Sequence, residues 1–149
     1  RIFELEEQLS EQKDFDSYSL KNVLGKKKDM INKIVNILDV SFPNIEFHDR
    51  TYKYLLQVEN ILPIMRKIYG ININNSIKKL IKDFKLKKIK GSDNCWEISK
   101  LSDGGKGAQG RLYLLPSING NRKTTVLLGA KKNQERDIAS ITKLEKMRS

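Results

Sequence analysis

Apolar residues recur at helical spacing in five stretches of the chain. In the sharpest of them, residues 76–86, apolar side chains stand at i, i+3, i+4 and i+7, and lysines occupy the opposite face. The other stretches follow the same period with interruptions, of which Gly25 and the three lysines after it are one. The pattern predicts helices over residues 2–12, 17–39, 50–62, 76–86 and 135–147.

Breaking and capping residues set the expected ends of these helices. Phe42-Pro43-Asn44 interrupts the apolar pattern and separates the second helix from the third. Pro63 is expected to break the third helix, because proline lacks the N–H that a helix interior needs. Side chains that accept a hydrogen bond from the first turn are expected as N-caps at Asp49, Asn74 or Asn75, and Asn133.

After residue 94 the hydrophobic period shortens to that of strands. Cys95–Ser99 is expected to be one strand, and Arg111–Leu115 a second that ends at Pro116. Asn119-Gly120 is a hairpin signal, and Thr124–Gly129 is the expected third strand. Ile45–Phe47 is the candidate for a further short strand. Between the first two long strands lies a Gly-rich loop over residues 102–110, which lacks the ending of a phosphate-binding P-loop.

This order of elements predicts an α+β fold. We expect an antiparallel sheet of three to four strands with helices to one side, preceded by an N-terminal helical extension. The expected domains are residues 1–43 for the extension and residues 44–149 for the α+β domain. The chain starts at Arg1 rather than Met, so we expect a processed or trimmed piece, and a larger parent protein stays open.

The formal net charge of +11 lies entirely in the second half of the chain. Residues 1–77 hold equal numbers of basic and acidic residues, whereas residues 78–149 hold 18 basic and 7 acidic ones. Basic side chains concentrated on one half predict a polyanionic partner, most often nucleic acid. The alternative is a solvated lysine-rich surface without a specific partner.

Cysteine and histidine usage limits the chemistry. The chain has one cysteine, Cys95, and one histidine, His48, so it can form neither an internal disulfide nor a Cys- or His-rich metal site. We therefore expect a reducing, cytoplasmic setting, no metal and no cofactor. No apolar run approaches the roughly 18 residues of a membrane span, and no signal peptide opens the chain. Cys95 and Trp96 are expected in the core, and His48 at the surface where a helix starts.

Three short motifs occur in order along the second half: LKKIKGSDNCWEIS, then GRLYLLPSI, then TVLLGAKK followed by the charged helix NQERDIASITKLEKM. Their order resembles that of the RelE/ParE superfamily of toxins from toxin–antitoxin systems, particularly its RelE- and HigB-like ribonucleases. The resemblance covers residues 44–149 and leaves residues 1–43 outside. It implies a sheet fold with a short first strand followed by two helices and an antiparallel sheet.

The resemblance also implies an activity and its residues. The activity is metal-independent cleavage of mRNA, usually on the ribosome, by attack of the RNA 2′-OH on the neighbouring phosphate, and the implied protein partner is an acidic antitoxin. Arg111 would clamp the phosphate, Glu97 would be the general base, and Lys131 and Lys132 would stabilise the transition state. The expected contacts to the RNA backbone are Lys85, Lys87, Lys88, Lys90, Lys100 and Arg136.

The residues are also compatible with two functions other than RNA cleavage. Active ribonucleases of the family often carry Tyr or His shortly after the basic pair, and residues 133–137 contain neither. The domain is therefore also compatible with a non-catalytic nucleic-acid-binding module, or with a ParE-type module that binds proteins. Tyr113 is compatible both with stacking on a base and with ordinary packing.

Overall fold

The computed structural model describes residues 12–58, 60–74, 76–99, 101, 110–117 and 123–148. Several expectations lie outside them: most of the helix over 2–12, the loop over 102–109, the Asn119-Gly120 turn and Lys100. The contacts divide the chain into two units, Arg1–Asn36 and Ile37–Ser149. This division falls seven residues before the boundary expected at residue 43.

The first helix is longer than its apolar pattern suggested. α1 spans Gln12–Ser41, and neither Gly25 nor the lysines that follow interrupt it. Lysine is a good helix former and a single glycine costs only about 1 kcal/mol, so the interruption expected here does not occur. The last turn of α1 contributes Leu38, which is 4% exposed, to the core of the second unit.

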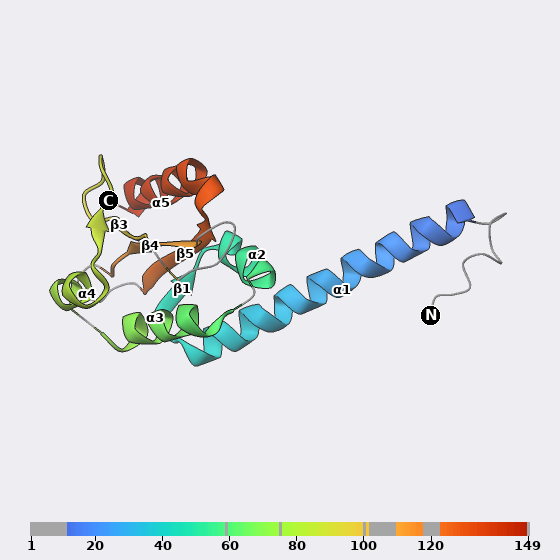
Figure 1. Ribbon diagram of the computed structural model, residues 1–149, viewed down its shortest axis with the longest axis horizontal. Coiled ribbons are helices and arrows are strands. Elements are labelled where there is room, and N and C mark those ends of the chain that lie inside the picture. The colour runs from blue at the N-terminus through green and yellow to red at the C-terminus, as the bar shows by residue number, and fades with distance from the viewer. Residues whose placement is uncertain are drawn as a thin grey trace. The chain divides into compact units, whose positions relative to one another are not determined.

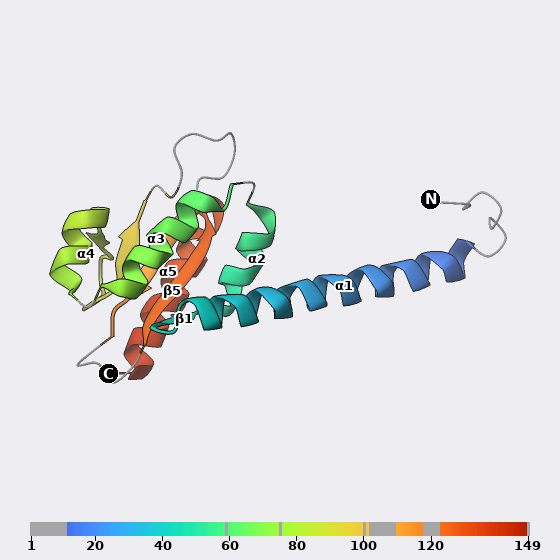
Figure 2. The same ribbon diagram turned by 90° about the horizontal axis from the view of Figure 1, so that it is seen from below.

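The second unit contains a five-stranded mixed sheet (Figures 1 and 2). The α+β class is confirmed, but the all-antiparallel sheet of three to four strands is wrong in two respects. The first strand pairs in parallel with the last, with Ile45 opposite Thr124, and the basic pair before the first hairpin forms a strand that was not expected. The spatial order is β1-β5-β4-β3-β2, with β1 at Ile45–Phe47, β2 at Lys87–Lys88, β3 at Trp96–Ile98, β4 at Gly110–Leu115 and β5 at Thr124–Ala130.

Helices cover both faces of this sheet rather than one. Figures 1 and 2 show α5 on one face and α3 on the other. Side chains on both faces of the central strand therefore lie in the interior, and all six residues of β4 are buried. The helices after α1 are α2 at Asp49–Gln57, α3 at Leu62–Ile73, α4 at Ile77–Phe84 and α5 at Gln134–Arg148, with a short 3₁₀ turn, η2, at Lys131–Asn133.

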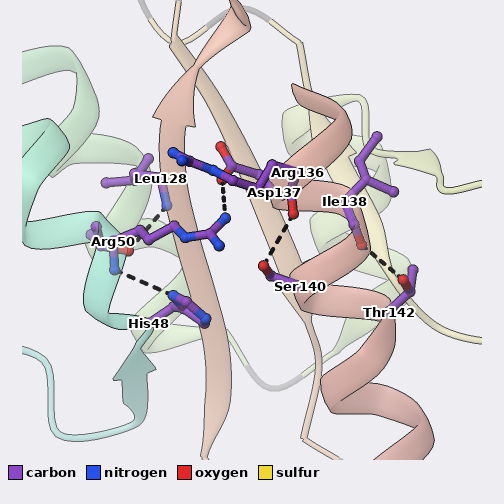
Figure 3. A network of polar contacts seen from close by, with 9 residues as sticks. His48, Arg50, Leu128, Arg136, Asp137, Ile138, Ser140 and Thr142 are labelled. Atoms are coloured by element: carbon purple, nitrogen blue, oxygen red, sulfur yellow. Dashed lines mark hydrogen bonds and ion pairs between the residues drawn. The ribbon is translucent and has the colours of Figure 1, made fainter. Parts of the chain in front are cut away.

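Beyond α1, three further expectations about helix ends and caps are wrong. α2 stops at Gln57, because Val58 is extended, and Pro63 lies in the first turn of α3, where its missing N–H costs nothing. The N-cap of α2 is His48, not Asp49: its Nδ1 accepts a hydrogen bond from the Arg50 N–H at 3.3 Å (Figure 3). Ser76 caps α4 in the same way, through its hydroxyl and the Lys79 N–H.

Alternation along β4 divides the core into two layers. Tyr113 and Leu115 face α5, and strand geometry directs Leu112 and Leu114 to the opposite face, which α3 covers. The layer beneath α5 also confirms Cys95 as a core residue, since its side chain is fully buried and burial raises the pKa of its thiol to about 12. This layer consists of Ile89, Cys95, Tyr113, Leu115, Leu127 and Ile141.

Thr51 joins α2 to the sheet where β1 ends. Its hydroxyl donates to the Val126 carbonyl at 3.3 Å and accepts from the Leu128 N–H at 3.1 Å. Both backbone groups belong to β5: Val126 is the partner of Phe47 in the last pair with β1, and Leu128 lies two residues beyond it. A single threonine thus continues the hydrogen bonding of the strand edge and fixes α2 beside β5.

Candidate nucleic-acid interface

The lysines of residues 78–90 form one exposed basic segment. Leu80 of α4 is 3% exposed and faces inward, so the amphipathic helix directs its lysines to solvent. After the helix, Leu86 and Ile89 are buried and the lysines around them are exposed. We call the set the lysine surface; it consists of Lys78, Lys79, Lys82, Lys85, Lys87, Lys88 and Lys90.

The backbone of Lys85 joins the helical and strand parts of the lysine surface. Lys85 has a left-handed φ of 52°, and its N–H bonds to the Ile81 carbonyl as the C-cap of α4. The chain turns there and enters β2, which forms one edge of the sheet. The ion pairs recorded among the described residues, Arg50–Asp137, Arg111–Glu97 and Arg148–Glu46, involve no member of this set.

Arg111 and Glu97 lie together, as a shared site requires, but they lie inside the protein. Arg111 is 8% exposed, and its Nε stands 3.4 Å from Glu97 Oε2. Its Nη1 donates to the Ser99 carbonyl at 2.5 Å and to the Gly110 carbonyl at 3.3 Å. Nε and Nη1 of the guanidinium therefore face a carboxylate and backbone carbonyls of the same chain.

Glu97 connects this pair to the start of α5. Its Oε2 also accepts a hydrogen bond from Gln134 Nε2 at 3.0 Å. Tyr113 is the cross-strand neighbour of Glu97, and burial, reinforced by the negative charge of Glu97, raises the pKa of the Tyr113 hydroxyl far above its usual value. Because Tyr113 is fully buried, it packs in the core rather than stacking on a base.

The remaining predicted residues lie where β5 gives way to α5. Lys131 and Lys132 are exposed in η2, and Arg136 is exposed in the first turn of α5. The sheet order separates β5 from β2 by three strand spacings, or about 14 Å. The structure therefore distributes the predicted RNA contacts over two places, the β2 edge of the sheet and the C-terminal end of the inner strand β5.

Sequence reasoning missed two cations, Arg50 and Lys53 of α2, which line a pocket together with Arg136. They belong to the half of the chain whose charges cancel, so the charge count gave no sign of them. His48 caps the same helix. Burial, with the positive charge of Arg50 next in size, lowers the pKa of His48 below 6.5, which favours the neutral imidazole that the cap requires.

No group of three or more Cys, His, Asp or Glu that could hold a metal occurs among the described residues. None of the helices in the described ranges is long and apolar enough to cross a membrane.

Comparison of the chain with protein-family models, with curated proteins and with solved structures finds no match. Membership of the RelE/ParE superfamily therefore stays a prediction from the motifs.

Proposed function

We propose that this protein is a nucleic-acid-binding module whose lysine surface contacts the phosphate backbone of RNA. The observation that supports this most is that all seven lysines of α4, its C-terminal turn, β2 and the residues directly after β2 are exposed. Lysine neutralises phosphates, and binding then releases the counterions condensed on the nucleic acid. The same contacts carry no sequence information, so we expect affinity with little base preference.

Binding is favoured over cleavage because of where Arg111 and Glu97 lie. A phosphate clamp needs free guanidinium donors, and a general base needs to reach the 2′-OH. Arg111 is turned toward Glu97 and two carbonyls, and Glu97 is shared with Gln134. Ribonuclease activity would require both side chains to leave these partners. Cleavage of the RNA is therefore one of the outcomes scored in the test below.

The test measures the salt dependence of binding to a labelled, mixed-sequence single-stranded RNA by fluorescence anisotropy. Each phosphate contact to a single strand contributes about −0.7 to the slope of log K against log salt, between about 50 and 200 mM. The triple variant Lys79→Gln, Lys82→Gln, Lys88→Gln is expected to bind more weakly, with a slope smaller in magnitude by about 2.

The matched control is Lys26→Gln, Lys28→Gln, Lys33→Gln, which removes the same charge from exposed positions of α1. Its slope is expected to match that of the wild type. Equal losses in the two triple variants would show that net charge, not the lysine surface, drives binding, and no binding at low salt would refute the proposal. RNA that is cut by the wild type and left intact by an Arg111→Ala protein shown to be folded would instead support the ribonuclease.

A further inference from the structure

A pocket of about 190 Å³ lies beside the start of α5. Its walls come from α2, the last residues of β5, η2 and the first turn of α5. The pocket is separate from the lysine surface, because β4 and β3 lie between β5 and β2 in the sheet. None of the expected catalytic residues lines it, and of the expected RNA contacts that the structure describes only Arg136 does.

The charged side chains that line this pocket are mainly cationic. They are Arg50, Lys53 and Arg136, with Asp137 as the single carboxylate among the lining residues. Asp137 is 1% exposed and its Oδ1 pairs with Arg50 Nη1 at 2.9 Å, so it neutralises one of the three cations. Lys53 and Arg136 are exposed and take part in none of the ion pairs between described residues, so within that part of the chain the pocket has two uncompensated positive charges.

Asp137 holds Arg50 at the pocket wall. Figure 3 shows Arg50 extending from α2 past Leu128 of β5 toward Asp137 of α5. The Asp137 carboxylate fits there because residue 129 is glycine: a Cβ at Gly129 would collide with Asp137 Oδ2. Arg50 keeps further guanidinium donors beyond the one that binds Asp137, and a guanidinium can hold two oxygens of a phosphate at once.

The start of α5 reinforces the attraction for an anion. Asn133 and Arg136 line the pocket from either side of the first residue of this 15-residue helix. The Gln134 N–H already donates to the Lys131 carbonyl of η2, but the peptide dipoles of α5 still add about half a positive charge at this end. Gln57, on the α2 wall, adds a neutral amide that can donate a hydrogen bond.

We propose that this pocket is a phosphate-binding site, in which Arg50, Lys53 and Arg136 hold the oxygens of a phosphate monoester or of free phosphate. Two uncompensated charges match a dianion better than a carboxylate, and arginine forks match the geometry of phosphate oxygens. The phosphate belongs either to the end of an RNA strand or to a small free phosphate compound. The site does not depend on the lysine surface, so this proposal does not rest on RNA binding.

The first experiment titrates the full chain with inorganic phosphate at constant ionic strength and follows backbone amides by NMR. Saturable shifts are expected at Arg50, Lys53, Gln134 and Arg136, with a dissociation constant of about 1 mM. Arg136→Gln is expected to weaken phosphate binding by about tenfold and Lys53→Gln by about fivefold, because each removes a charge-assisted contact. The matched control is Arg66→Gln, at an exposed position of α3 outside the pocket, which should leave binding unchanged.

The second experiment separates the two sources of the phosphate. An RNA with a 5′-phosphate that binds about tenfold more tightly than its 5′-hydroxyl form, with the difference lost in Arg136→Gln, would assign the pocket to a strand end. Equal binding of the two RNAs, with inorganic phosphate still bound, would assign it to a small free phosphate compound.

The proposal is overturned if phosphate produces no saturable shifts around the pocket, or if Arg66→Gln weakens binding as much as Arg136→Gln does. A chain that binds phosphate but no RNA would remove the proposed function and leave this site standing.

Discussion

Arg111 has the chemistry of a phosphate ligand but a location inside the protein. Its Nη1 donates to the carbonyls of Ser99 and Gly110, and its buried Nε lies 3.4 Å from the Glu97 carboxylate without a hydrogen bond. An intact buried ion pair contributes little net stability, because the cost of desolvating both charges offsets their attraction. Removal of one partner is nevertheless strongly destabilising, because the other charge is left buried without compensation. Substitution of Arg111, which would test its contact with RNA, is therefore expected to lower the stability of the fold as well.

We predict that Arg111→Ala lowers the free energy of unfolding by about 3 kcal/mol, because Glu97 loses its cation and two carbonyls lose their donor. Urea denaturation of the full chain measures the change. Lys79→Ala, at an exposed position of the lysine surface, should change stability by less than about 0.5 kcal/mol and serves as the control. If the Arg111→Ala protein had normal stability but no affinity for RNA, the result would contradict this prediction and support Arg111 as the phosphate clamp.

For single residues, the sequence predicts whether a side chain is exposed better than it predicts which side chains it contacts. The lysines of α4 were expected on an outer face, because the apolar period of residues 77–84 assigns the opposite face to the core. Alternation also indicates that Arg111 and Tyr113 share a face of the sheet. It cannot indicate that α5 covers that face, nor that a glycine in β5 makes room for Asp137, because both depend on packing between distant segments.

Among the elements, helices with a clear apolar stripe were predictable whatever their length, whereas the 12-residue α3 and the shortest strand were not. α4 and α5 lie within one or two residues of the expected ranges. β2 has only two residues, too few to show any alternation, and the pairing of β1 with β5 leaves no local signal in the sequence. Pro63 marks the start of α3 rather than the end of α2, since proline suits the first turn of a helix as well as the residue after one.

The link between α2 and β5 gives a prediction at this scale. Thr51→Val keeps the shape of the side chain but removes the hydroxyl, so the buried Leu128 N–H loses its acceptor. We expect a loss of about 1 to 3 kcal/mol in the free energy of unfolding, together with faster hydrogen exchange of the Leu128 amide.

Thr142→Val is the matched control for this substitution. Its hydroxyl bonds to the Ile138 and Ala139 carbonyls of its own helix (Figure 3 shows the first), so its loss should cost less than about 1 kcal/mol. Equal effects of the two substitutions would mean that Thr51 does not tie α2 to the sheet.

For the whole molecule, the division of the chain determines which fragment should fold. The second unit begins at Ile37, and its core includes Leu38 and Phe42, which are 4% and 8% exposed. The Phe42 ring packs edge-on against Phe47 of β1, with 6.2 Å between ring centroids. A cut at the boundary expected from sequence, before residue 44, would remove both side chains.

We therefore predict that residues 37–149 fold cooperatively and that residues 44–149 are less stable by roughly 5 kcal/mol or more, since loss of a buried Leu or Phe side chain costs about 2 to 5 kcal/mol. Thermal and urea unfolding of the two fragments, followed by circular dichroism, give the comparison. Fragments of equal stability would show that the end of α1 contributes nothing to the core.

The parallel pairing of β1 with β5 also bears on how the protein is made. Ile45 meets Thr124, 79 residues further along the chain, whereas Leu115 of β4 meets Thr125 after only 10. Closing the longer loop costs more entropy, so the β4–β5 hairpin should form first and β1 should add to it late. During synthesis β1 leaves the ribosome well before β5 exists, with the side chains of Ile45 and Phe47 uncovered in the meantime. The nascent chain is thus prone to aggregation through these side chains from the time β1 leaves the ribosome until β5 emerges and covers them.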